Sequence, residues 1–249
     1  MSYCEARGIS FSYGTRPILD EISFDLNRGE VIAFIGPSGC GKSTLLRCIA
    51  GLLKPQRGTI RIGNNEVFAP HKCSFMFQRP TLLPWLSVRE NLTLPFKLQS
   101  RPLNERDVLD ALDETHISNV AISLPANLSG GEAQRVAFAR ALLEQRTVIL
   151  LDEPFSSLDE IRRRSLAALL SKTIYEKNLA GILVTHSIHD AVFIASKIYV
   201  LGTSPALIVG EFSVPLPMPR IEDLWMGEEL VPFMRQVRNL LEVGNHHET

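Results

Sequence analysis

Short apolar runs alternate with amphipathic stretches along most of the chain, a pattern typical of an α/β fold with a largely parallel sheet. Four of these runs are short and nearly continuous in apolar residues: Val31–Ile35, Val148–Leu151, Ile182–Thr185 and Ile198–Leu201. Strands of this kind are usually covered on both faces, so we expect them to form the buried centre of the fold. The opening, from Tyr3 to Leu26, alternates more like antiparallel strands, with a turn at Tyr13-Gly14.

The segment from Pro80 to about Gln145 follows a different pattern. It is rich in Pro and Leu at first, then helical from about Pro102 to Leu112 and again from Gly131 to Gln145. No run in it resembles a buried strand. We therefore predict one domain over residues 1–249, with an α/β core (1–79 and 147–215), an inserted helical lobe (80–146) and a C-terminal tail (216–249). The tail begins with a Pro-rich link and should hold a helix within Glu222–Leu240.

Composition narrows the class of protein without deciding it. The 249 residues are 45% hydrophobic and 21% charged, and the formal net charge of −1 gives no global field that would attract nucleic acid. No apolar run approaches the roughly 18–20 residues of a membrane-spanning helix, and the first eight residues lack an apolar signal core. The four cysteines form no CxxC pair and no metal spacing, as expected for reduced thiols in a cytosolic protein. Any membrane role would therefore require a partner.

A phosphate-binding loop is predicted between the strand Val31–Ile35 and a helix from Thr44 to Ala50. The sequence there fits G-x-x-x-x-G-K-[ST]. Glycines let backbone N–H groups surround the phosphates, and the following helix N-terminus adds positive potential. Lys42 should reach the β- and γ-phosphates of ATP, and Ser43 should ligate Mg²⁺. The expected nucleotide-binding residues here are Gly36, Pro37, Ser38, Gly39, Cys40, Gly41, Lys42, Ser43 and Thr44.

Polar residues follow two further apolar strands, at the edge of the sheet where the phosphate loop should lie. Asp152 ends one strand and is expected to hold Mg²⁺, while the adjacent Glu153 could act as the general base for water. His186 ends another and could sense the γ-phosphate. Taken alone, these would be a solvated acidic turn and a structural histidine; the phosphate loop favours the functional interpretation. The remaining histidines that we considered, His71, His116 and His189, are predicted to be solvated or structural.

The segment Leu128–Arg135 predicts a second anion site, because Ser129 would cap a helix whose Gly130 and Gly131 expose backbone N–H groups. By itself it could be an ordinary capped helix. It resembles the signature motif of ATP-binding cassette (ABC) ATPases, and the resemblance spans almost the whole chain. It implies a P-loop NTPase core with a mostly parallel sheet, an N-terminal antiparallel β subdomain and an inserted α-helical subdomain.

In that family two cassettes dimerise head to tail, and each ATP is enclosed between one phosphate loop and the other protomer's signature. The resemblance therefore implies that Ser129, Gly130, Gly131 and Glu132 contact the nucleotide of a second copy. Tyr13 resembles the aromatic residue that stacks on adenine. Gln78 resembles the glutamine that touches Mg²⁺ and links core to lobe, and Asp159 lies in the segment that crosses the interface. Glu153, His186 and Lys42 are all present as catalytic residues, so both sites of a homodimer should hydrolyse ATP.

A partner surface is predicted at Gln78–Asn91, where the Leu-Leu-Pro-Trp cluster suits a socket for a partner helix. Leu82 and Leu86 could equally belong to the core of the lobe; Trp85 is the better candidate for exposure. This stretch, with Pro217–Arg220, resembles the ATPase subunits of bacterial nitrate/sulfonate/taurine-type importers, a group that includes pyrimidine transporters. The resemblance implies transmembrane permease partners, an indirectly coupled soluble substrate-binding protein, and a peripheral position at the cytoplasmic face of the bacterial inner membrane.

Two other functions remain open from the sequence. One is an export-type ABC ATPase subunit, although export cassettes are often fused to membrane helices. The other is a soluble ABC ATPase acting on nucleic acid or the ribosome, which would usually carry insertions and a basic surface. With one cassette and no basic excess, we expect no nucleic-acid partner. A small-molecule kinase would leave Leu128–Arg135 unexplained.

Overall fold

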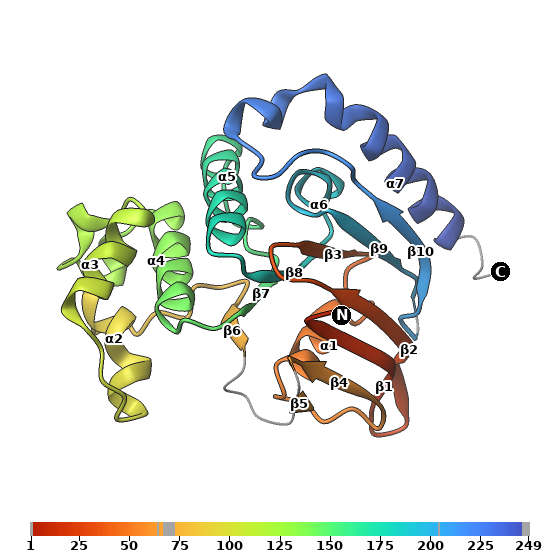
Figure 1. Ribbon diagram of the computed structural model, residues 1–249, viewed down its shortest axis with the longest axis horizontal. Coiled ribbons are helices and arrows are strands. Elements are labelled where there is room, and N and C mark those ends of the chain that lie inside the picture. Colours follow the sequence, from red (N-terminus) through yellow and green to blue (C-terminus); the bar gives the residue numbers. More distant parts are fainter. Residues whose placement is uncertain (1, 64, 67–72, 204, 246–249) are drawn as a thin grey trace.

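The computed structural model describes residues 2–63, 65–66, 73–203 and 205–245. Two sheets with their covering helices form one part of the molecule, and a group of helices lies to one side of it (Figure 1). The arrangement confirms the predicted α/β fold with an N-terminal antiparallel subdomain and an inserted helical subdomain. Among the described residues, no helix combines the length and the apolar character that crossing a bilayer requires.

The central sheet has six strands in the order β10-β9-β3-β8-β7-β6. Its strands are β3 (Val31–Ile35), β6 (Cys73–Met76), β7 (Val148–Asp152), β8 (Ala180–Thr185), β9 (Lys197–Leu201) and β10 (Ile208–Ser213). All neighbours pair in parallel except β9 and β10. The four predicted strands are confirmed, whereas β6 and β10 were not predicted. Because the strands are parallel, their carboxyl ends meet at one edge, which is where the site residues lie.

Alternate residues of the central strands face two different layers, as the period of a strand requires. Ile32 and Phe34 pack into a cluster with α1 (Lys42–Ile49) and the antiparallel sheet. Val31, Ala33 and Ile35 pack into the opposite cluster. That second layer is built from the helices α5 (Glu160–Glu176), α6 (Ile188–Ile194) and α7 (Val231–Asn245). Helices on one side and a second sheet on the other therefore enclose the parallel sheet (Figure 1).

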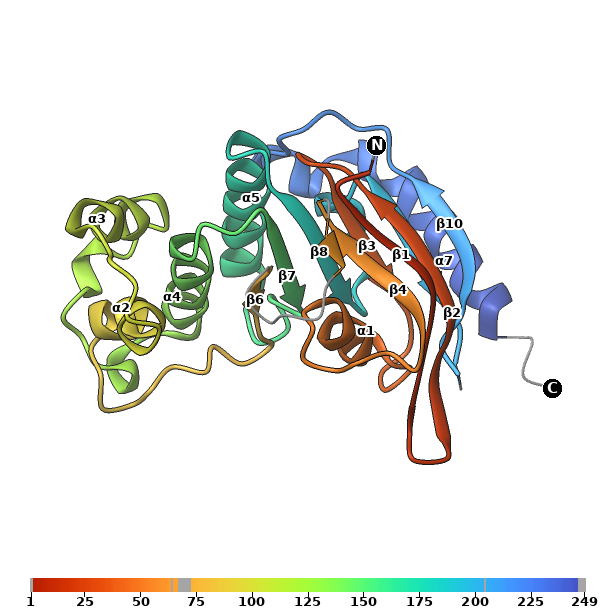
Figure 2. The same cartoon turned by 60° about the horizontal axis from the view of Figure 1, so that its bottom comes forward.

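The antiparallel sheet has the order β2-β1-β4-β5. Its strands are β1 (Cys4–Tyr13), β2 (Arg16–Leu26), β4 (Arg57–Ile62) and β5 (Asn65–Glu66). The β1–β2 turn falls immediately after Tyr13, as predicted, and projects beyond the sheets (Figure 2).

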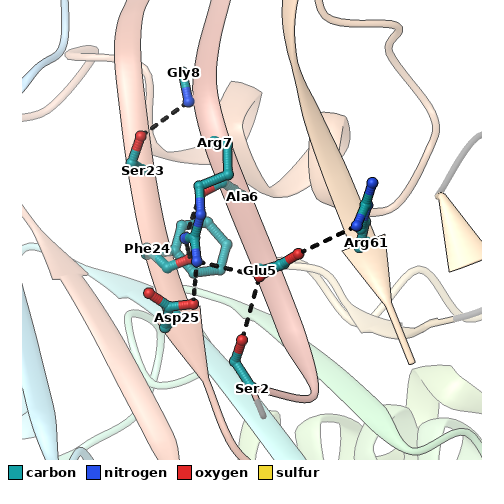
Figure 3. A network of polar contacts seen from close by, with 9 residues as sticks. All are labelled: Ser2, Glu5, Ala6, Arg7, Gly8, Ser23, Phe24, Asp25 and Arg61. Atoms are coloured by element: carbon teal, nitrogen blue, oxygen red, sulfur yellow. Dashed lines mark hydrogen bonds and ion pairs between the residues drawn. The ribbon is translucent and has the colours of Figure 1, made fainter. Parts of the chain in front are cut away.

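An ion-pair network crosses the outer face of this sheet (Figure 3). The guanidinium of Arg7 bonds the carboxylates of Asp25 at 2.6 Å and Glu5 at 3.1 Å, and Glu5 also lies 3.9 Å from Arg61. The hydrogen bond from Arg7 lowers the pKa of Asp25. Both residues are about half exposed, so solvent screens the pair and its contribution to stability is small.

The helical lobe consists of α2 (Val88–Leu98), α3 (Glu105–Glu114) and α4 (Gly130–Leu143). These helices share a separate hydrophobic cluster that includes Leu92, Leu112 and Val136. The predicted helices at Pro102–Leu112 and Gly131–Gln145 correspond to α3 and α4. Helix α2 was not predicted, because Pro95 lies inside it; a capping box between Ser87 and Glu90 starts it.

The C-terminal segment packs against the second layer of helices. Two short 3₁₀ turns, Glu222–Met226 and Glu228–Leu230, precede α7, so the tail helix begins later than predicted. Trp225 is buried against the rings of His189 and Phe193, and its Nε1 donates to Glu160 Oε1 at 2.7 Å. The guanidinium of Arg220 is also buried, where it donates to the carbonyls of Val192 and Val214, and burial lowers its pKa to about 10.

Candidate nucleotide site

The phosphate loop connects β3 to α1 at the carboxyl edge of the parallel sheet. Gly39 and Gly41 have φ of 79° and 121°, values that side-chain-bearing residues rarely adopt. A Cβ at Gly36 would lie 2.8 Å from the carbonyl oxygen of Leu201. The ammonium of Lys42 donates to the carbonyls of Gly36 at 2.8 Å and Pro37 at 2.7 Å, so it lies across the loop that precedes it.

Ser43 and Asp152 meet directly at this edge. The hydroxyl of Ser43, in the first turn of α1, donates to Asp152 Oδ1 at 2.9 Å, and Asp152 is the last residue of β7. Burial raises the pKa of the Asp152 carboxyl, and the Ser43 hydrogen bond acts in the opposite direction. Adjacent carboxylate and hydroxyl oxygens are the donors that a small, hard cation such as Mg²⁺ prefers.

The backbone turns sharply at Glu153, the residue after Asp152. Its φ of 44° lies in the left-handed region, and its N–H donates to Val184 of β8 at 2.9 Å. Its Oε2 lies 3.0 Å from His186 Nδ1 and 3.4 Å from Gln78 Nε2. Two side chains from different elements thus converge on one carboxylate oxygen, an arrangement that can hold a general base in place.

An open cleft of about 490 Å³ lies over the phosphate loop. Tyr13, Gln78 and Glu153 line it with Ser38, Gly39, Gly41, Lys42, Ser43 and Thr44. The structure therefore brings most of the predicted nucleotide-site residues together, while Cys40 is buried beneath the loop. Two lining residues, Arg16 and Ile18 of β2, were not predicted. No motif signalled them; only the pairing of β2 with β1, which ends at Tyr13, places them here.

The signature residues do not line this cleft. Ser129 caps α4 and forms a capping box with Glu132, whose carboxylate accepts from the Ser129 N–H at 2.8 Å. Interaction with the Ser129 side chain, and then with its N–H, lowers the pKa of Glu132. Asp159 caps α5 and accepts from the N–H of Arg162 at 3.0 Å. Gly131 packs against the same Arg162, since a Cβ there would lie 3.0 Å from its Cδ. The first turns of α4 and α5 therefore adjoin each other.

Gln134 links the lobe to Gln78, a contact that the sequence did not predict. Its side chain is buried, and its Nε2 donates to the backbone carbonyl of Gln78 at 2.9 Å. The only available signal was its place within Leu128–Arg135. Of the other histidines, His189 is structural because its Nε2 bonds the carbonyl of Trp225 at 2.8 Å, His116 is exposed, and His71 lies outside the described residues.

A family model described as ABC transporter matches residues 19–156, more than half of the chain. The chain belongs to the ABC transporter family. A curated ABC relative, the aliphatic sulfonates import ATP-binding protein SsuB 2 of Burkholderia cenocepacia (strain HI2424), is 40% identical over 209 residues, which cover 84% of this chain and 77% of that protein. The ABC cassette is thus an ATP hydrolase of the importer type.

Solved ABC cassettes share the fold. The dimeric post-hydrolysis structure of the ATP-binding cassette MJ0796 with ADP and Pi has a TM-score of 0.75 at 29% identity, covering 86% of this chain and all of that one. CbiO1 from Clostridium perfringens, part of a cbiONQ ABC transporter complex, has a TM-score of 0.77 at 25% identity, covering all of this chain and 99% of that one. These matches confirm the P-loop NTPase fold and an ATP-binding function.

Proposed function

We propose that this ABC ATPase drives import of a small sulfonate or related solute through partner permease subunits, with Glu153 as the general base of ATP hydrolysis. The observation that carries the proposal is the convergence of His186 and Gln78 on Glu153 Oε2 beside the phosphate loop. The names of the curated relatives, which include aliphatic sulfonate importers of Burkholderia and Xanthomonas, support the solute class.

Most residues of the cleft have a proposed task. Tyr13, with 47% of its surface exposed, offers a ring face for adenine. The loop amides and Lys42 bind the phosphates, and Lys42 exchanges its two carbonyl partners for phosphate oxygens. Glu153 takes a proton from the attacking water, and His186 holds the carboxylate in place.

A Mg²⁺ ion fits the donor set of Ser43 and Asp152, with Gln78 as a further oxygen donor nearby. When bound, the ion would neutralise charge on the phosphate oxygens. Asp152 is well suited to hold it, because a buried carboxylate gains more from a cation than a solvated one does.

A second copy of the chain would complete the γ-phosphate site. Ser129, Gly130, Gly131 and Glu132 lie outside the cleft of their own protomer, which supports their use by the opposite protomer in a head-to-tail dimer. Asp159, which caps α5 beside the signature helix, would lie in the same interface.

The proposed permease contact lies beside Gln78, where apolar side chains line a groove of about 350 Å³ between core and lobe. The stacked rings of Phe75 and Phe77 line it, together with Leu94 and Leu98 of α2. Trp85 is 69% exposed, as expected for a partner contact, whereas Leu82 packs against the lobe. Through the Gln134–Gln78 hydrogen bond, lobe movement would be transmitted to Glu153. With such a contact, the protein would lie at the cytoplasmic face of the bacterial inner membrane.

Glu153→Gln tests the base directly. The amide keeps its size but cannot accept the proton, so we expect turnover to fall roughly 10²–10⁴-fold while ATP binding persists and a closed dimer accumulates. Glu176→Gln, at the exposed end of α5, is the matched control. Normal turnover in Glu153→Gln would overturn the assignment. ATPase stimulation in the reconstituted complex, by binding protein loaded with sulfonates, nitrate or pyrimidines, would identify the solute.

A further inference from the structure

A second cavity, of about 250 Å³, lies at the edge of the central sheet opposite the nucleotide cleft. Its walls come from residues that precede parallel strands: Arg28 before β3, Thr147 before β7 and Leu179 before β8. Ser74 of β6 and the segment that follows α4 complete it. The cavity shares no lining residue with the nucleotide cleft, so it is a separate site.

The cavity is positively charged. Arg28, Arg146 and Lys177 line it, and none of the described residues lining it is acidic. The ammonium of Lys177 forms an ion pair at 2.7 Å with Glu114, which does not line the cavity. Arg28 donates to the carbonyl of Asn178 at 3.2 Å and lies over the ring of Tyr3, and it forms no ion pair with a carboxylate among the residues that the structure describes.

Two polar groups of the cavity are buried and unpaired. Ser74 is 2% exposed, and its hydroxyl has no hydrogen-bond partner among the described residues. Arg146 Nε is likewise buried without a partner in the described part of the chain. Orphaned buried groups of this kind usually have an unseen partner, either a water or an ion. Arg28 is exposed and Arg146 is partly buried, so water can solvate their charges. An anion would in addition pair with both guanidinium groups and accept a hydrogen bond from the Ser74 hydroxyl.

We propose that this cavity binds a small tetrahedral oxyanion, with Arg28 and Arg146 as its cationic ligands and the Ser74 hydroxyl as a neutral donor. The proposal goes beyond ATP hydrolysis and does not depend on it. The negative end of the α4 dipole disfavours an anion in this cavity. One carbonyl at that end, that of Leu142, is already satisfied, because it accepts from the Gln145 N–H at 3.0 Å. Because Arg146 follows the last helix of the lobe and Arg28 belongs to the core, the bound anion would tie the two parts together.

Thermal unfolding in sulfate and in chloride at matched ionic strength tests the proposal on the full chain. A ligand that binds only the native state raises Tm saturably, by roughly 3–6 °C at tenfold above its dissociation constant. Sulfate also stabilises proteins non-specifically, so the test is the difference in the rise of Tm between the parent and the variants. We expect the saturable part of the rise to be lost in Arg146→Gln and reduced in Ser74→Ala, a change small enough to preserve the fold.

The nucleotide cleft could also take up sulfate, and Lys42→Ala separates the two sites. The proposal predicts that the saturable rise survives in Lys42→Ala and disappears in Arg146→Gln. The reverse outcome, or an equal rise in all variants, would overturn it. Phosphate and methanesulfonate identify the source of the anion. A rise with sulfate and phosphate but not with methanesulfonate supports a free inorganic ligand, whereas an equal rise with methanesulfonate extends the site to sulfonate groups.

Discussion

The ring of His186 lies 3.0 Å from the carboxylate of Glu153, Nδ1 to Oε2, although the two residues are 33 positions apart. Each follows a buried strand, and the neighbouring strands β7 and β8 bring them together. With an ionised Glu153, the ring donates from Nδ1. His186 is therefore placed to orient the carboxylate, and its own contribution to nucleotide binding should be smaller than its contribution to turnover.

Replacing His186 with alanine should separate turnover from binding. We expect kcat to fall roughly 10²-fold, because the carboxylate loses its orienting partner, with a much smaller change in KM for ATP. Steady-state ATPase kinetics measure both quantities. His116→Ala, which removes an exposed ring in the lobe, should match the parent. A loss confined to KM would contradict the orienting role.

Asp152→Asn should make the protein more stable and less active. Burial raises the pKa of Asp152 in the folded state, so folding favours its protonated carboxyl. This contribution to stability is fully present below the unfolded pKa of about 3.9 and is lost as pH rises through the folded pKa. Asparagine resembles the protonated form and still accepts from Ser43. We therefore expect a higher Tm than the parent at pH 7, a difference that shrinks as pH falls and vanishes below the unfolded pKa of about 3.9.

The same variant should bind Mg²⁺ at least roughly tenfold more weakly, because an amide replaces a charged ligand. Thermal unfolding at several pH values and Mg²⁺-dependent ATPase assays give the two readouts. Asp20→Asn, at an exposed position, should change neither. A pH-independent Tm difference would show that burial of this carboxyl is not the cause.

Alanine substitution of the two tryptophans should have different effects on stability. Trp225 is 2% exposed, and its truncation should cost about 3–5 kcal/mol of unfolding free energy. Trp85 is 69% exposed, and its truncation should change that free energy by no more than about 0.5 kcal/mol. Trp85→Ala should instead weaken copurification with the permease subunits. Urea unfolding measures the first effect, and equal destabilisation by both variants would argue against Trp85 as a partner contact.

The parts of the fold that were predictable carry strong local signals. The central strands β3, β7, β8 and β9 are nearly continuous in apolar residues, and the phosphate loop has fixed spacing. By contrast, β6 has only four residues and β10 is a half-exposed edge strand with a mixed pattern. Helix α2 was hidden by Pro95, whose lost N–H is outweighed by the packing of Leu92 and Phe96 in the lobe.

The sequence predicted which residues would lie together at one edge of the sheet. It did not predict which of their side chains would contact one another. Parallel strands imply that Asp152 and His186 share an edge. Nothing local indicates the left-handed backbone of Glu153, which turns its carboxylate toward His186. The buried Gln134–Gln78 bond likewise depends on how α4 packs against the core, which is a tertiary property.

Whether each ATP site is shared between two copies can be tested by mixing two inactive variants. Lys42→Ala disables the phosphate loop, and Ser129→Arg disables the signature of the opposite copy. Mixed dimers contain one site with both halves intact, so the equimolar mixture should recover roughly a quarter of the parent ATPase rate. Activity that stays at the level of the separate variants would contradict a composite site.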